Sequence, residues 1–230
     1  MPVFQLNTEI SFPPTEYAEK DGLLAVGGDL SEERLLHAYS MGIFPWYSEN
    51  WPILWWSPDP RLVLLPEELI VSRSLRQAIK KRKFTVTLDE AFEEVIANCA
   101  AVRRKDDEGT WITDEMMHAY IKLHHSGFAH SVESWYDGEL AGGLYGISLG
   151  NAFFGESMFS VVSDASKVAF VLLVQQLREW GFAFIDCQVT TGHLLSFGAR
   201  EIHRGRFLDM LKQSLQEPTR LGKWDFTLQK

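Results

Sequence analysis

The chain has 230 residues, of which 46% are hydrophobic and 23% charged, so it can bury a substantial core in one large domain or in a domain with a small companion. Its formal net charge of −9 argues against wholesale wrapping of nucleic acid but leaves room for a local basic patch. Two cysteines cannot build a disulfide framework, and no stretch reaches the roughly 18 apolar residues of a membrane-spanning helix.

The N-terminus has no basic region before an apolar core, so we expect no signal peptide and a cytoplasmic, reducing location. No His, Cys and Asp cluster has zinc-site spacing, so we expect no metal.

The first sixty or so residues are rich in loop signals. Asp29 and Ser31 offer N-cap side chains for a short helix that ends at Gly42. The segment 44–60 is dense in Pro and Trp and cannot form one regular element, so it predicts a rigid aromatic loop leading into a strand at 62–65.

Regular elements follow from residue 72. The pattern predicts a basic helix over 72–83, a strand over 84–88, and a helix whose capping box runs from Thr87 to Glu90. Thr113 is predicted to cap a further helix that stops at Gly127.

The second half alternates strands and helices. Strands are predicted at 129–136 and 139–147, joined by Asp137-Gly138, which is a strong hairpin signal, and a third strand begins at residue 152. Ser163 and Asp164 are predicted to cap a long helix up to Gly181, followed by a strand over 182–187 and a final helix through residue 215.

This order of elements predicts an α+β (α/β-type) fold around a mostly antiparallel sheet. We expect a small, loop-rich N-terminal domain over 1–62 and a larger domain over 63–230.

Two apolar stretches contain acids. In FFGESMFS, Ser157 lacks the second glycine of a hydrolase elbow, which disfavours a nucleophile. Glu156 between Phe154 and Met158 lies either at a solvated edge or in a pocket. Similarly, Asp186 with Gln188 ends an apolar strand and either lines a cleft or caps the following turn.

Aromatic and basic clusters allow two interpretations each. The tryptophans of FPWYSENWPILWWSPDPR can stack on bases or can pack one domain onto the other. The helix RSLRQAIKKRK is either a solvated face or a phosphate-binding patch.

Several motifs occur in the order seen in the leucyl/phenylalanyl-tRNA–protein transferase family, which the chain therefore resembles: GLLAVGGDLS, GIFPWYS, ILWWSPDPR, GTWIT, AHSVE, GGLYG, GESMFS, ASK and IDCQ. The resemblance runs from about Gly22 to Phe207. It implies an enzyme that moves Leu or Phe, with Met as a minor donor, from aminoacyl-tRNA to a protein's N-terminal Arg or Lys, marking that protein for N-end rule degradation. It also implies a GNAT-like acyltransferase fold for the larger domain; we expect a monomer that needs no cofactor.

The resemblance also implies roles for individual residues. Trp46 and Trp111 match positions near the terminal adenosine of the tRNA, and the polar catalytic group consists of Glu156, Asp186 and Gln188. Positions at or near the pocket for the aminoacyl side chain are Leu144, Phe153, Met158, Leu173 and Ile185, and tRNA acceptor-stem phosphates would meet Arg73, Arg76, Lys80, Lys81 and Lys83.

Strand alternation places Phe153 and Met158 on opposite faces. If both line the pocket, a β-bulge near Gly155 must redirect one of them.

An aminoacyl ester is already activated, so the enzyme needs to align the ester with the amine and stabilise the developing oxyanion. We expect Asp186 to orient Gln188, whose carbonyl oxygen holds the amine, while Glu156 assists by hydrogen bonds or attracts the acceptor's positive charge.

Two rival functions remain at this stage. An acetyl-CoA-dependent N-acetyltransferase would carry a glycine-rich pyrophosphate loop before the long helix, where this chain has SVVSDASK. A non-catalytic module binding tRNA or basic N-termini would not need the Asp186 and Gln188 pair.

Overall fold

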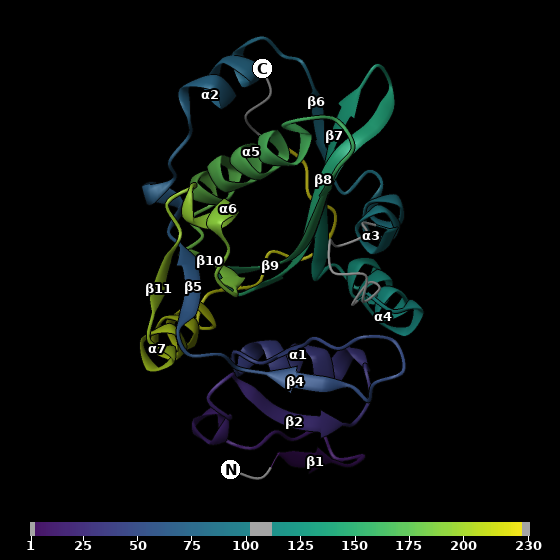
Figure 1. Cartoon of the computed structure of the whole chain (residues 1–230), viewed down its shortest axis with the longest axis vertical. Helices are drawn as coiled ribbons and strands as arrows, with labels where there is room; N and C mark the ends of the chain where they lie inside the picture. Colours follow the sequence, from purple (N-terminus) through teal and green to yellow (C-terminus); the bar gives the residue numbers. More distant parts are fainter. Residues whose placement is uncertain (1–2, 102–111, 227–230) are drawn as a thin grey trace.

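The computed structural model describes residues 3–101 and 112–226. They form a four-stranded sheet in the order β1-β2-β4-β3 and a seven-stranded sheet in the order β11-β5-β10-β9-β8-β7-β6 (Figure 1). The strands of the small sheet are β1 (Phe4–Leu6), β2 (Leu23–Gly27), β3 (Phe44–Pro45) and β4 (Leu54–Trp56).

The larger sheet carries most of the remaining elements. Its strands are β5 (Arg61–Leu64), β6 (Thr85–Leu88), β7 (Ala129–Tyr136), β8 (Glu139–Leu149), β9 (Ala152–Ser160), β10 (Phe184–Gln188) and β11 (Arg200–Ile202). The helices are α1 (Glu32–Ser40), α2 (Arg73–Lys80), α3 (Phe92–Ala101), α4 (Asp114–His125), α5 (Ala165–Glu179), α6 (Gly192–Leu195) and α7 (Arg204–Ser214). Single-turn 3₁₀ helices occur at Thr15–Tyr17 and Pro66–Glu68.

The small sheet departs from the sequence expectation of loops before residue 62. Its strands are only two to five residues long, which is too short for an alternating pattern to stand out. The helix predicted in this region is present as α1, and the Ser31 hydroxyl accepts a hydrogen bond from the Arg34 N–H.

The larger sheet confirms the α+β prediction and its mostly antiparallel character. Within it, β9 and β10 form a parallel pair, while the other neighbouring strands run antiparallel. The predicted hairpin joins β7 and β8, and both Asp137 and Gly138 have positive φ, at 51° and 84°, as a type I′ turn requires.

One predicted helix cap is wrong, and a second is right in position only. Thr87 belongs to β6, and the start of α3 is instead served by Glu133 of β7, whose carboxylate accepts a hydrogen bond from the Ala91 N–H at 3.4 Å. Asp164 is the N-cap residue of α5, but it has a left-handed φ of 71°, and its side chain pairs with Lys167 instead of capping the helix. The Ser160 hydroxyl accepts a hydrogen bond from the Ser166 N–H. At α3 a contact from a distant strand replaces the local signal, whereas at α5 the replacing contacts are also local.

Helices cover both faces of the larger sheet. Figure 1 shows α3 and α4 on one side of β7 and β8 and α5 on the other, with the small sheet and α1 at one end. The core on the α3 side is continuous with that of the small sheet, because Tyr39 and Trp55 share one buried cluster with Phe92 and Phe154. This shared core brings α1 against strand β9.

Candidate active site

The site lies where the parallel strands β9 and β10 separate. Their pairing runs from Phe184 opposite Ala152 to Asp186 opposite Phe154 and stops there. Beyond this point β9 stays paired with β8, and β10 stays paired with β5. The gap that opens at the carboxyl ends of two parallel strands is a favoured place for a ligand.

A β-bulge in β9 redirects the side chains at this gap. Tyr145 faces Ser157 and Gly146 faces Gly155, so Glu156 is the extra residue without a partner on β8. Because of this bulge, Phe153 and Met158 both line one cavity even though simple alternation places them on opposite faces.

Glu156 accepts hydrogen bonds from three parts of the chain. The donors are the hydroxyl of Tyr39 on α1 at 2.7 Å, the hydroxyl of Tyr120 on α4 at 3.0 Å, and the side-chain amide of Gln188 at 2.7 Å. The two tyrosine hydroxyls also lie 2.5 Å apart. Burial, reinforced by the Glu156 charge, raises the pKa of both tyrosines well above its ordinary value, so they remain donors.

The same surroundings favour a proton on Glu156. Burial raises the pKa of Glu156 to about 7, although its hydrogen bonds pull in the opposite direction. The hydroxyls of Tyr39 and Tyr120 and the carboxyl group of Glu156 make three mutual contacts, and each contact needs one hydrogen atom. The two tyrosines provide two of these hydrogens, and a protonated Glu156 provides the third. Glu156 therefore titrates in the physiological range.

Asp186 is buried and makes a bidentate ion pair with Arg61, at 2.8 and 2.6 Å. The guanidinium group also donates to the Gly42 carbonyl oxygen at 3.1 Å and lies over the rings of Phe44 and Phe207. Removal of one partner from such a buried pair strongly destabilises the fold, because the other charge remains buried without compensation.

Asp186 and Glu156 hold different parts of Gln188. The main-chain N–H of Gln188 donates to Asp186 at 2.9 Å, whereas its side chain is held by Glu156. Gln188 has a φ of 60°, which is unusual for a residue with a side chain, and the β10–β5 register shifts at this point. We expected Asp186 to orient Gln188. Asp186 does contact Gln188, but through the main-chain N–H, whereas the side-chain amide of Gln188 is oriented by Glu156.

The cavity has a volume of about 350 Å³ and is apolar along most of its wall. Of the five positions expected at the aminoacyl pocket, Leu173 is buried in the core outside this wall. The wall includes the other four, Leu144, Phe153, Met158 and Ile185, together with Phe170 and Leu194. Glu156 and Gln188 are hydrogen-bonded to each other in the wall and are called its polar end; Ser157, Thr191 and His193 also line the cavity.

The other predicted residues that the structure describes are not part of the cavity wall. Trp46 is partly exposed, and its ring lies 5.8 Å from that of Trp56, whose indole N–H donates to the Trp46 carbonyl oxygen. Trp111 lies outside the described residues. The five basic residues predicted to meet phosphates are all exposed, namely Arg73, Arg76, Lys80, Lys81 and Lys83.

Sequence reasoning missed Arg61, Tyr39 and Tyr120. Arg61 ends the motif ILWWSPDPR and is the first residue of the otherwise apolar strand β5, which is the local signal for a buried arginine. The tyrosines carry no such signal, because each sits on the apolar face of an ordinary helix.

Among residues 3–101 and 112–226, no group of His, Cys, Asp and Glu side chains is arranged to hold a metal ion. In the same ranges, none of the helices has the length and apolarity needed to cross a bilayer.

Comparison with known proteins identifies the family. Residues 63–212 match the model "Leucyl/phenylalanyl-tRNA protein transferase", and residues 28–59 match the model of that family's N-terminal domain. The chain belongs to this family. Transferases of that name from Desulfatibacillum aliphaticivorans and Syntrophobacter fumaroxidans are 61% and 60% identical to it, over 97% and 98% of this chain and 96% of each relative. The corresponding transferase of Myxococcus xanthus is 58% identical, over 97% of both chains.

Among solved structures, L-PGS from Bacillus licheniformis aligns with 74% of this chain and 54% of its own, at 12% identity and a TM-score of 0.40. The family of close relatives makes this protein an aminoacyltransferase, with an aminoacyl-tRNA as donor and a protein as acceptor.

Replacing Asp186 tests the buried ion pair. Asp186→Asn leaves the Arg61 charge without its partner and should lower the free energy of unfolding by about 3–5 kcal/mol in chemical denaturation. The exposed pair of Glu68 and Arg200 is the control, and Glu68→Gln should cost less than about 1 kcal/mol. Equal losses in the two variants would contradict the account of a buried, uncompensated charge.

Replacing Glu156 tests its raised pKa. The folded protein binds the Glu156 proton more tightly than the unfolded chain does, so this group's stabilisation is present at low pH and is lost as pH rises through about 7. The free energy of unfolding of the wild type, relative to Glu156→Gln, should therefore fall between about pH 5 and pH 8. Glu179→Gln, at the exposed end of α5, is the surface control. A pH-independent difference for Glu156→Gln would show that the carboxyl group is not perturbed.

Proposed function

We propose that this transferase moves Leu or Phe, and Met less efficiently, from its tRNA to the α-amino group of a protein's N-terminal Arg or Lys. The observation that carries the proposal is an apolar cavity whose polar end holds Gln188 and Glu156. The apolar part suits a branched aliphatic or aromatic side chain, and the polar end suits the reacting ester and amine. The product would be a protein marked for N-end rule degradation, and the enzyme would act as a cytosolic monomer.

The reaction requires alignment and hydrogen bonding rather than an enzyme nucleophile. The neutral acceptor nitrogen attacks the ester carbonyl carbon, an amide bond forms, and the bond to the ribose oxygen breaks; the nitrogen loses one proton and the ribose oxygen gains one, which releases tRNA with a free hydroxyl group. Because Glu156 engages the amide nitrogen of Gln188, the carbonyl oxygen of Gln188 is the atom left to accept a hydrogen bond from the incoming amine. Asp186 supports this arrangement by holding the backbone of Gln188.

Glu156 gives the polar end a charge that depends on pH. In its ionised form it would attract the positive side chain or ammonium group of an N-terminal Arg or Lys. With a pKa of about 7, that attraction strengthens as pH rises toward the range in which the acceptor amine also loses its proton.

The cavity walls would select the donor by shape. Phe153, Met158 and Ile185 surround the space with apolar surface, so Leu and Phe gain contacts that a smaller side chain lacks. A single methylene difference is worth only about 1–3 kcal/mol, so discrimination against Met is expected to be partial. The resemblance to the family implies that Trp46 and Trp111 lie near the terminal adenosine of the tRNA.

The basic helix α2 would hold acceptor-stem phosphates. Its charged residues are exposed, and the helix packs on α5, which contributes Phe170 to the cavity wall. Because the chain as a whole has a net charge of −9, tRNA phosphates would bind at this local basic surface on α2.

A transfer assay tests the function. Labelled Phe from Phe-tRNA should appear in a protein beginning with Arg, and Gln188→Ala should lower kcat at least about tenfold while changing donor affinity much less. Absence of label in the wild-type reaction would overturn the transferase assignment, and label from acetyl-CoA would favour the acetyltransferase instead. Equal losses of kcat and affinity would remove Gln188 from the reaction step.

Charge reversal on α2 tests the tRNA surface. The double variant Arg76→Glu with Lys80→Glu should weaken tRNA binding. It should also make the slope of the logarithm of the binding constant against the logarithm of the salt concentration shallower by up to about two. The double variant Lys20→Glu with Lys212→Glu changes the net charge equally at exposed positions elsewhere and should retain the slope. If both double variants bind alike, net charge rather than α2 governs the interaction.

A further inference from the structure

The cavity residue Phe153 is held from behind by the C-terminal segment. Its ring packs directly on the β8 backbone, since a Cβ added at Gly146 would lie 2.5 Å from Phe153 Cζ. On another side the ring of Trp224 lies 6.0 Å away, tilted by 40°. Phe153 is only 1% exposed, so these neighbours determine how far its ring projects into the cavity.

Trp224 is itself fixed along its whole length. The indole stacks on His130 at 3.6 Å and 9° and meets the ring of Trp180 edge-on at 5.0 Å. Its main-chain N–H donates to Asp89 at 2.7 Å, and its indole N–H donates to the Arg220 carbonyl oxygen at 3.0 Å. The side chain is 2% exposed, which leaves the indole no free space.

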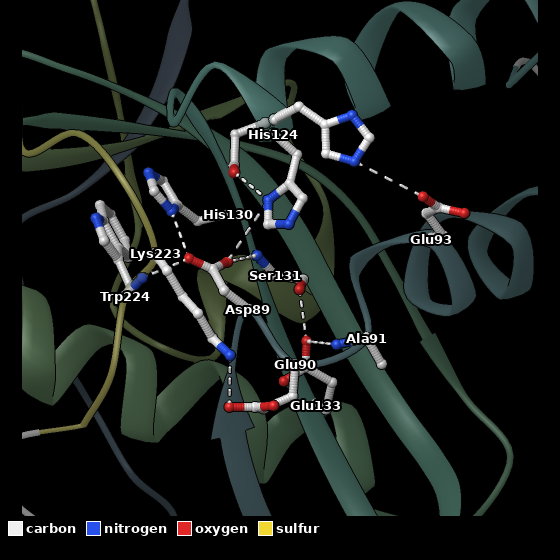
Figure 2. Close-up of polar contacts among 12 residues, drawn as sticks. Asp89, Glu90, Ala91, Glu93, His124, His130, Ser131, Glu133, Lys223 and Trp224 are labelled. Carbon is white, nitrogen blue, oxygen red and sulfur yellow. Dashed lines mark hydrogen bonds and ion pairs between the residues drawn. The ribbon is translucent and has the colours of Figure 1, made fainter.

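Asp89 is the anchor of this arrangement (Figure 2). It has a positive φ of 56°, is buried, and accepts hydrogen bonds from His130, from the Ser131 N–H and from the Trp224 N–H. Beside it, Lys223 pairs with Glu90 at 2.9 Å, as Figure 2 also shows. The chain thus uses several polar contacts to hold one indole behind the cavity wall.

We propose that Trp224 is a positioning residue for donor selection, acting through Phe153 to set the size of the cavity. The inference rests on the proposed function of that cavity as the pocket for the aminoacyl side chain. A closely packed core transmits the loss of a neighbour to the next side chain, so a smaller residue at 224 lets Phe153 withdraw. The enlarged cavity would then retain contacts with Phe but lose contacts with Leu.

The test compares two tryptophans with the same replacement. Trp224→Phe should raise the ratio of kcat/KM for Phe-tRNA to kcat/KM for Leu-tRNA by at least about threefold. Trp55→Phe in the N-terminal sheet is the matched control, because it also removes a buried indole and one indole hydrogen bond, to Gly27 at 2.9 Å. The control should leave the ratio unchanged. Partial unfolding lowers both kcat/KM values equally, so it does not move the ratio.

A second background tests whether the effect passes through Phe153. In a Phe153→Leu protein, Trp224→Phe should have no further effect on the donor ratio, because the ring that Trp224 supports is absent. An unchanged ratio after Trp224→Phe, an equal shift in Trp55→Phe, or a full additional shift in the Phe153→Leu background would each overturn the proposal.

A binding measurement separates this proposal from the proposed function. The probes are the 3′-amide analogues of phenylalanyl-adenosine and leucyl-adenosine, whose relative affinity does not depend on turnover. If the wild type binds them but transfers nothing, the proposed reaction fails, and the shift in their affinity ratio still supports or overturns the role of Trp224. If the wild type binds neither analogue, the role of Trp224 in donor selection is overturned as well.

Discussion

A carboxyl group carried by the extra residue of a β-bulge connects the separate parts of the site. Glu156 on β9 accepts hydrogen bonds from Tyr39, Tyr120 and Gln188, which belong to α1, α4 and β10. In a strand without the bulge, strict alternation of side chains between the two faces would fix the direction of residue 156. Its carboxyl group would then not meet the three donors. Since each donor is largely buried, removal of Glu156 would leave several polar groups unpaired.

The two carboxyl groups of the site meet opposite environments. Asp186 faces a guanidinium group that neutralises its charge, so it serves as a fixed part of the framework beneath Gln188. Glu156 meets only neutral donors in a buried setting, so its pKa rises to about 7 and its charge responds to pH. One acid is therefore a fixed part of the framework, and the other carries a charge that can change with pH in the cavity wall.

The local pattern singled out Glu156, Asp186 and Gln188 because a polar group inside an apolar strand needs a reason to be there, while the resemblance to the family implied their shared role. It could not identify their partners: Tyr39 and Arg61 lie 117 and 125 residues away in the chain from the acids that they contact. For the same reason the Thr87 capping box failed, since Glu133 from another strand serves the helix start. Most of the larger sheet was predictable from apolar runs and turns, whereas its three-residue strand β11 and the short strands of the small sheet had no pattern long enough to read.

The central claim is that Glu156 acts by holding the side chain of Gln188. A double-mutant cycle on the single-turnover rate of transfer, with Glu156→Ala, Gln188→Ala and the pair, tests it most directly. If Glu156 works through Gln188, the double variant should be no slower than Gln188→Ala alone. Losses that multiply in the double variant would show that the two residues act independently and would contradict the account.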